Sequence, residues 1–473
     1  MTTPMTPVNA GSTPNVGAAQ PAPRPAATAP RDYHFPRFER ATLPNGLRLV
    51  VAPVRKLPLV TVLAVVEAGA TAEPAGKYGL ASLTAQLLLE GAAGLDGAAL
   101  ADRFERLGAS VEASADWDIA GVSLTALRAQ LPEVLALLRD LLRAPTFPAR
   151  EVERLREERL AELLQQEAEP RGLADEQFSR AVYAPSARYA SPEGGDPASV
   201  RALTREDVVA FYGARFRPAG TTLVFAGDLT MAEARALADS LFGDWAGDRA
   251  PASLAGVDAA QEGPLTRLIA KADAPQSELR VGHVGLARGT SDYFDAMVMN
   301  AILGGLFSSR INLNLREAHG YTYGAFSAFD WRRARGPFVV STAVKSDVTA
   351  AAVQEILGEI DRMRREEIGE EELTLATSYL DGVFPIRYET TSAIAAALAN
   401  LVIHELPDDY YDRYRERVRG VTTAGVLAAA QRHLHPDALR IVVVGDPATV
   451  AAPLGAVTGH PVDIQSPDGA SLT

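Results

Sequence analysis

The chain has 473 residues, a formal net charge of −13 and no cysteine. Its length predicts two domains of about 200 residues each, and its 47% hydrophobic and 22% charged residues are typical of a globular protein. The absence of cysteine excludes disulfides, a thiolate nucleophile, iron–sulfur clusters and Cys-ligated zinc. The acidic balance argues against a nucleic-acid partner. No segment reaches the roughly 18 consecutive apolar residues that a membrane-spanning helix needs.

Both ends of the sequence have the composition of tails. Residues 1–33 are rich in Pro, Ala and Thr and lack the apolar stretch of a secretory signal. They predict a disordered segment, and a cytoplasmic protein by default, or a periplasmic one if a signal has been removed. Residues 451–473 are again rich in Pro, Gly, Ser and Ala, and are predicted to be a second flexible tail.

In chain order, the first half mixes short strands with amphipathic helices. The Asn45-Gly46 pair predicts a hairpin turn between two strands. The hydrophobic periodicity then predicts a strand at 59–68, a helix at 78–90, paired strands within 108–127, and helices at 133–143 and 149–166. The second half predicts a similar series: a strand at 277–284, a helix at 293–303, strands at 321–330 and 336–344, and helices at 349–365 and 369–379.

An internal repeat relates the two halves. Residues 203–228 align without a gap to residues 421–446, at a shift of 218 positions. Each copy reads as a Thr-capped helix, a Pro-containing loop and an apolar strand that ends in Gly-Asp. A period this long indicates two homologous domains rather than a solenoid.

The predicted fold class is therefore α+β, with two homologous domains that each pack helices on one face of a mixed sheet. The expected boundaries are an N-terminal domain at 34–245, a linker at 246–264 and a C-terminal domain at 265–450.

A family resemblance begins at residues 67–81, EAGATAEPAGKYGLA. This segment resembles the insulinase-type zinc peptidases, including pitrilysin and the mitochondrial processing peptidase, in which an inverted H-x-x-E-H motif follows Gly-Leu-Ala on a helix. In that motif the two His bind zinc and the Glu acts as the base. The corresponding positions here are Ser82, Ala85 and Gln86. The resemblance therefore implies a degenerate zinc motif.

No other group restores a metal site in the sequence. The resemblance places the family's third zinc ligand at Glu162, but a single Glu in the charged segment RLREERLAELLQQE usually faces solvent. His433 and His435 form an H-x-H pair with no third ligand or general base near them in the sequence. A G-x-S-x-G elbow, a G-x-G-x-x-G loop and a Walker loop are all absent. We expect no metal in this chain.

The most informative segment of the second half is residues 304–323, GGLFSSRINLNLREAHGYTY. It predicts a Gly loop, a helix with an apolar face and a stop at Gly320. Judged by residue type alone, Arg316 would satisfy carbonyls at the helix end and Tyr323 would pack against the protein.

The same segment is similar to the second-domain motif of the insulinase family, which has a Gly-rich loop, Ser-Arg, Leu-Arg-Glu and Gly-x-x-Tyr. The resemblance implies that Arg316 and Tyr323 hold substrate at a zinc centre, where both side chains can donate hydrogen bonds to a peptide carbonyl and its developing oxyanion. It also implies weaker candidates for substrate contact, which are Gly304, Gly305, Ser308, Ser309 and Arg310.

The resemblance covers residues 35–446 and implies a division of labour. Some bacterial members of the family are heterodimers in which one subunit carries the zinc motif and the other carries the Arg/Tyr pair. This chain has the second pattern, which predicts the zinc-free half of a clamshell-like metallopeptidase that is inactive alone. Its expected partners are a homologous zinc-bearing subunit and an unfolded peptide. The alternatives are a catalytically inactive peptide-binding or scaffold protein and, third, an autonomous enzyme with some other chemistry.

Overall fold

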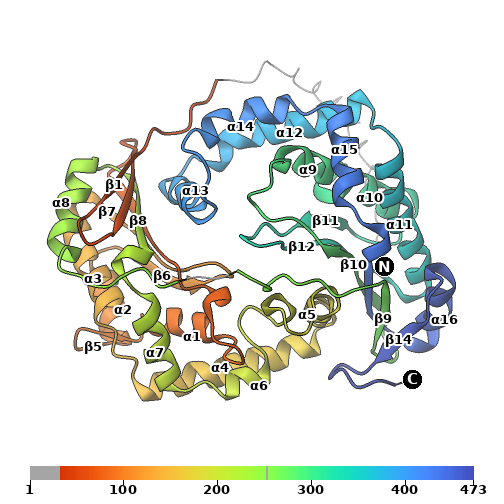
Figure 1. Cartoon of the computed structure of the whole chain (residues 1–473), viewed down its shortest axis with the longest axis horizontal. Coiled ribbons are helices and arrows are strands. Elements are labelled where there is room, and N and C mark those ends of the chain that lie inside the picture. The colour runs from red at the N-terminus through yellow and green to blue at the C-terminus, as the bar shows by residue number, and fades with distance from the viewer. Residues whose placement is uncertain (1–31, 252–253, 473) are drawn as a thin grey trace, which may run out of the picture. The chain divides into compact units, whose positions relative to one another are not determined.

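The computed structural model describes residues 32–251 and 254–472, and a single compact unit begins at His34. The predicted N-terminal tail lies almost entirely outside the described residues. The main architecture is two six-stranded mixed sheets with packed helices (Figure 1). This confirms the predicted α+β class.

The first sheet has the strand order β1-β2-β8-β3-β7-β6. Its strands are β1 (Glu39–Thr42), β2 (Arg48–Pro53), β3 (Leu59–Val66), β6 (Ser110–Ala115), β7 (Ala120–Leu127) and β8 (Thr221–Gly227). The predicted hairpin is present, because β1 and β2 pair antiparallel around Asn45-Gly46. A separate short ribbon joins β4 (Gly91–Ala92) to β5 (Leu95–Asp96).

The second sheet has the order β11-β12-β10-β13-β9-β14. Its strands are β9 (Leu265–Ala270), β10 (Gln276–Val284), β11 (Ala325–Phe329), β12 (Pro337–Lys345), β13 (Arg440–Gly445) and β14 (Val462–Gln465). The repeated strands β8 and β13 occupy equivalent positions, since each pairs antiparallel with one neighbour and parallel with the other. The sheets differ at one edge, where β1 pairs antiparallel and β14 parallel.

The helices of the first half are α1 (Leu80–Leu87), α2 (Gly97–Arg106), α3 (Leu131–Arg143), α4 (Ala149–Ala168), α5 (Pro170–Val182), α6 (Pro197–Arg201), α7 (Arg205–Arg215) and α8 (Met231–Phe242). Those of the second half are α9 (Tyr293–Asn300), α10 (Arg310–Asn312), α11 (Thr349–Arg365), α12 (Glu370–Arg387), α13 (Thr391–Ile403), α14 (Tyr410–Arg419), α15 (Thr423–His433) and α16 (Pro447–Thr458). The repeated helices α7 and α15 begin as the sequence predicts, because Thr204 and Thr422 each accept a backbone N–H bond as N-cap. Among the described residues, no helix combines the length and the hydrophobicity that crossing a bilayer requires.

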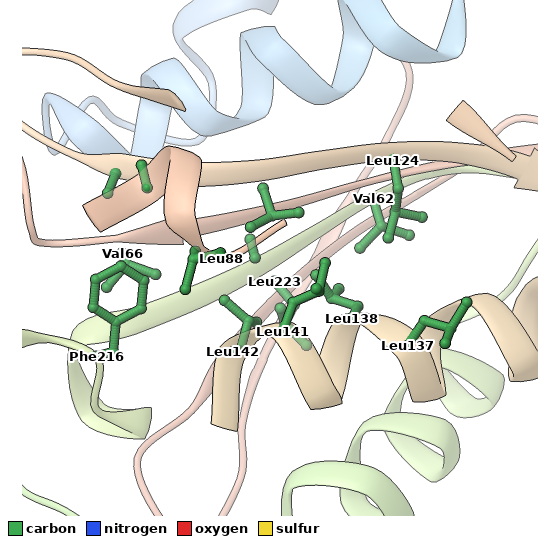
Figure 2. Packing of buried hydrophobic residues seen from close by; sticks show 14 of the residues in the cluster. Val62, Val66, Leu88, Leu124, Leu137, Leu138, Leu141, Leu142, Phe216 and Leu223 are labelled. Atoms are coloured by element: carbon green, nitrogen blue, oxygen red, sulfur yellow. The ribbon is translucent and has the colours of Figure 1, made fainter. Parts of the chain in front are cut away.

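The first core forms between one face of the first sheet and its helices. Along β3, Val60, Val62, Ala64 and Val66 point into this core, as strand alternation requires. Figure 2 shows the α3 side chains Leu137, Leu138, Leu141 and Leu142 packed against strand residues that include Val62, Leu124 and Leu223. These leucines recur at helical spacing, so α3 presents one apolar stripe to the sheet.

The two halves exchange helices across their sheets. Helix α13 of the second half contacts β3 and β8, and α5 of the first half contacts β13 and β10. Thr61 of β3 hydrogen-bonds Thr391 of α13 at 2.9 Å between hydroxyl oxygens. On the other side, the buried guanidinium of Arg280 in β10 donates to Asp175 of α5 at 2.5 Å. Each sheet therefore carries its own helices and also one helix from the other half.

The prediction of a flexible tail at 451–473 is wrong for most of this range. Helix α16 continues to Thr458, and β14 adds a parallel strand to β9. The composition misled the prediction because the Ala, Gly and Pro residues lie in a helix whose Val450 and Leu454 are buried. The C-terminal segment is therefore part of the second sheet, and the predicted domain end at residue 450 is too early.

Candidate functional site

The degenerate motif lines a cavity of about 340 Å3. Ser82 and Gln86 lie one turn apart on α1, and Glu162 reaches the same cavity from the neighbouring helix α4. Ala85 is fully buried in the first core instead. The structure thus brings together the positions that the resemblance assigns to the three zinc ligands, although two of them carry side chains unsuited to zinc.

The start of α1 is held by a buried ion pair. Glu73 accepts the backbone N–H of Ala81 at 2.8 Å, and its other carboxylate oxygen accepts two bonds from the guanidinium of Arg188. Arg188 also donates to the carbonyl oxygens of residues 191, 192 and 193. The pair therefore ties the helix that bears the degenerate motif to the loop that closes the cavity.

Two carboxyl groups near this cavity have strongly raised pKa values. Burial raises the pKa of Glu73 to about 7, against the opposing effect of Arg188. Burial, with a smaller contribution from Asp116, raises the pKa of Glu193 to about 7. Glu193 lines the cavity, so one of its walls changes charge near neutral pH.

The residues at the cavity do not fit zinc. In the part of the chain that the structure describes, no three His, Cys, Asp or Glu side chains are grouped so that they could hold a metal ion. The carboxylate of Glu162 is already paired with Arg159 at 3.0 Å. The H-x-H pair is used elsewhere, since His433 hydrogen-bonds Asp292 at 2.7 Å.

The purified chain is therefore expected to carry no stoichiometric zinc. The Glu162→Gln variant is expected to have the same metal content as the wild type. Metal analysis by mass spectrometry after dialysis against zinc-free buffer checks this. About one zinc per chain that is lost in the Glu162→Gln variant would contradict it.

Glu193→Gln is expected to increase the free energy of unfolding relative to wild type, and this increase should be larger at alkaline pH than at acid pH. The folded-state pKa of Glu193 lies above that of the unfolded chain, so its contribution to stability is present below the unfolded value and is lost as the pH rises through about 7. The variant lacks this loss. Urea unfolding of both proteins at pH 5 and pH 8 checks it, and a difference that does not depend on pH would refute it.

The second candidate segment, residues 304–323, overlaps two turns of π-helix. Residues 301–305 and 313–318 each form a turn of π-helix, a feature common at functional sites. Ile311 and Leu315 are fully buried, which confirms the predicted apolar face. Gly320 has a φ of +65° and donates its N–H to the carbonyl of Arg316, so it ends the helix as predicted.

Tyr323 is presented outward by a fixed backbone. Its side chain is 94% exposed, the most of any large apolar side chain in the described residues. On either side of it, the Thr322 hydroxyl oxygen and the Gly324 carbonyl oxygen each lie 3.0 Å from the hydroxyl oxygen of Thr342 in β12, within hydrogen-bond distance. The chain is thus anchored next to the phenol while the ring contacts solvent, two residues before the edge strand β11 begins.

Arg316 is partly exposed and loosely held. Its Nε atom lies 3.5 Å from a carboxylate oxygen of Glu317, and its guanidinium lies 4.6 Å from the ring centre of Phe307. Among the interactions of the described residues, none joins the Arg316 side chain to that of Tyr323. Tyr323 is exposed rather than packed, and in the described residues no hydrogen bond joins the Arg316 side chain to a carbonyl at the helix end.

The five weaker candidates divide by burial. Gly305 and Ser308 are exposed. Gly304 is buried, and a Cβ there would lie 2.4 Å from the hydroxyl of Ser327, so glycine is needed for close packing on β11. Ser309 is 1% exposed. The guanidinium of Arg310 donates two bonds of 2.7 Å to Glu372. For Gly304, Ser309 and Arg310 these placements favour a structural role, while substrate contact stays a prediction.

Sequence reasoning missed the charged residues that surround the degenerate motif. Arg156, Arg159 and Glu193 line the cavity with the predicted positions. One signal was available for Arg159, because it lies three residues before Glu162 and so shares its helix face. No local pattern indicates Glu193, whose loop comes next to α1 only in the folded chain.

The known proteins similar to this chain agree with the family resemblance. The profile of the insulinase family, peptidase family M16, matches residues 50–190, and that of the peptidase M16 inactive domain matches residues 202–380. An uncharacterised zinc protease of Mycobacterium tuberculosis (strain H37Rv) is 25% identical over 88% of this chain and 92% of its own length. A probable mitochondrial-processing peptidase subunit beta of Schizosaccharomyces pombe is 28% identical over 57% of this chain and 59% of its own.

A solved structure agrees as well. The peptidase M16 inactive domain from Pseudomonas fluorescens superposes with a TM-score of 0.80 at 26% identity, covering 87% of this chain and 98% of that one. The two family profiles follow one another along the chain, and one solved structure of the family covers most of it. This chain belongs to the insulinase family of peptidases, family M16.

Proposed function

We propose that this chain is the zinc-free subunit of a heterodimeric metallopeptidase, in which it supplies Arg316 and Tyr323 to the zinc site of a homologous partner. The observation that carries the proposal is the placement of Tyr323. A phenol that is 94% exposed, on a backbone anchored to β12, has no packing role in this chain. A phenol hydroxyl that contacts solvent, carried on an anchored backbone, is available for such a substrate contact.

The degenerate cavity supports the same proposal. Ser82, Gln86 and Glu162 line one cavity, and two of these three positions carry no zinc-binding side chain, so in this proposal the metal comes from another chain. The name of the fission-yeast relative describes a subunit, which accords with a peptidase assembled from several chains. Zinc would be held by the partner, and this chain would bind the peptide.

Co-expression with a homologue that carries H-x-x-E-H tests the assembly. Size-exclusion chromatography is expected to show one complex with equal amounts of the two chains and one zinc per complex. A catalytically inactive scaffold remains the alternative. Failure of the two chains to associate, at concentrations where each is folded, would contradict the heterodimer.

A further inference from the structure

We propose that Arg159 is an internal cation that has replaced the metal ion of the degenerate cavity, and that it keeps zinc out even when the missing ligands are restored. This inference concerns the isolated chain and does not depend on the proposed partner. Glu162 is the one ligand position of the degenerate zinc site that still carries a side chain able to bind zinc. Its carboxylate accepts a bond from Nη1 of Arg159 at 3.0 Å. The guanidinium therefore pairs with one oxygen of the carboxylate that zinc would use, and this carboxylate is 55% exposed.

The position of Arg159 is built into the surrounding loop. Its Nε donates to the carbonyl oxygen of Gly194 at 3.1 Å. A Cβ at Gly194 would lie 2.7 Å from Nη2 and 3.0 Å from Cζ of the same guanidinium, so any other residue there would displace it. The side chain is three-quarters buried. The Arg159 guanidinium thus lies against the loop, in space that the glycine at position 194 leaves open.

The next glycine fixes this loop against α1. A Cβ at Gly195 would lie 2.3 Å from the carbonyl oxygen of Tyr78, and Gly195 has a φ of +79°, which favours glycine. Gly79, at the start of α1, also has a positive φ of +92° and would place a Cβ 2.6 Å from the carbonyl of Gly194. The close contact between this loop and α1 fixes the carbonyl of Gly194, which accepts the hydrogen bond from Arg159.

The charge of Arg159 explains why it would exclude a metal. A guanidinium stays protonated at any pH at which the protein is folded. A cavity of about 340 Å3 is roughly 9 Å across, so a divalent ion inside it would lie within about one Debye length of this charge. It would also have to compete for Glu162. Loss of the two His ligands and the presence of Arg159 are therefore two separate barriers to zinc.

Restoring the ligands with and without Arg159 separates the two barriers. In the double variant Ser82→His with Gln86→His, zinc content is expected to stay below about 0.1 per chain after dialysis. Adding Arg159→Met, which removes the charge and keeps the length, is expected to raise it to about one zinc per chain. The affinity measured by titration calorimetry should rise by about 100-fold or more.

The matched control adds Arg154→Met to the same double variant. Arg154 lies on the same helix but does not line the cavity, so zinc content is expected to stay low. Circular dichroism melts establish that all variants are folded, and zinc should raise the melting temperature of the Arg159→Met variant alone. Tight zinc binding by the double variant with Arg159 intact would overturn the proposal. So would a folded triple variant, with Arg159→Met, that still binds no zinc.

Discussion

Tyr323→Phe is expected to lower the turnover of the assembled peptidase by about 10²–10³-fold, or roughly 3–4 kcal/mol of transition-state stabilisation. In the proposed function this hydroxyl donates to the substrate carbonyl as negative charge develops on it. Phenylalanine keeps the ring and removes only the donor. Because the ring is 94% exposed in the free chain, the substitution should leave folding, assembly and zinc content unchanged. Steady-state kinetics of the complex on a peptide measure the effect.

Tyr379→Phe is the matched control. Tyr379 lies on α12 and is 52% exposed, so the variant removes a second solvent-exposed phenol hydroxyl. Its complex should keep the wild-type turnover. If the Tyr323→Phe complex also keeps the wild-type turnover, the exposed phenol does not serve the reaction. That result would favour a scaffold or peptide-binding role for this chain.

Arg188→Met is expected to reduce the free energy of unfolding by about 3–5 kcal/mol at pH 8, because it leaves the carboxylate of Glu73 buried without its partner. The Glu73 side chain is fully buried and that of Arg188 is 7% exposed. The pKa of Glu73, already raised to about 7 by burial, should rise further without the guanidinium. At pH 5 the carboxyl is then neutral in the folded protein, so the loss should be smaller there.

Two further variants separate the buried charge from the lost packing. Arg154→Met removes a guanidinium that is 46% exposed and pairs with Glu90, Glu151 and Glu158, so each lost pair should cost less than about 1 kcal/mol. Adding Glu73→Leu to Arg188→Met should recover much of the stability, since no charge is then left unpaired. Urea unfolding of the four proteins checks the series. A loss for Arg188→Met that is the same at pH 5 and pH 8 would contradict the account.

Much of the fold was predictable because its signals are local. The Thr caps at residues 204 and 422 and the Asn-Gly turn at residues 45–46 were identified from neighbouring residues, and the structure has all of them. The exchange of α5 and α13 between the sheets was not predictable. It depends on long-range packing such as the contact of Thr61 with Thr391, which no pattern within one helix records.

The candidate site divides in the same way. The resemblance assigned Ser82, Gln86 and Glu162 to ligand positions, and the structure lines one cavity with them, although the charged segment around Glu162 favoured a solvent-facing side chain. The exposure of Tyr323 did not, because a tyrosine beside a strand is more often packed, and only the bonds of Thr342 show how its backbone is held. Arg159 was missed because charged residues on a helix usually face solvent. Its partner at Gly194 is 35 positions away along the chain.

A peptidase assay on the separate and combined chains tests whether this chain completes the zinc site of a partner. An H-x-x-E-H homologue, this chain and an equimolar mixture are each given an unstructured fluorogenic peptide in zinc-containing buffer. We expect negligible hydrolysis by either chain alone and rapid hydrolysis by the mixture, with the rate saturating at one copy of this chain per zinc. Full activity of the zinc-bearing homologue alone, unchanged when this chain is added, would contradict it.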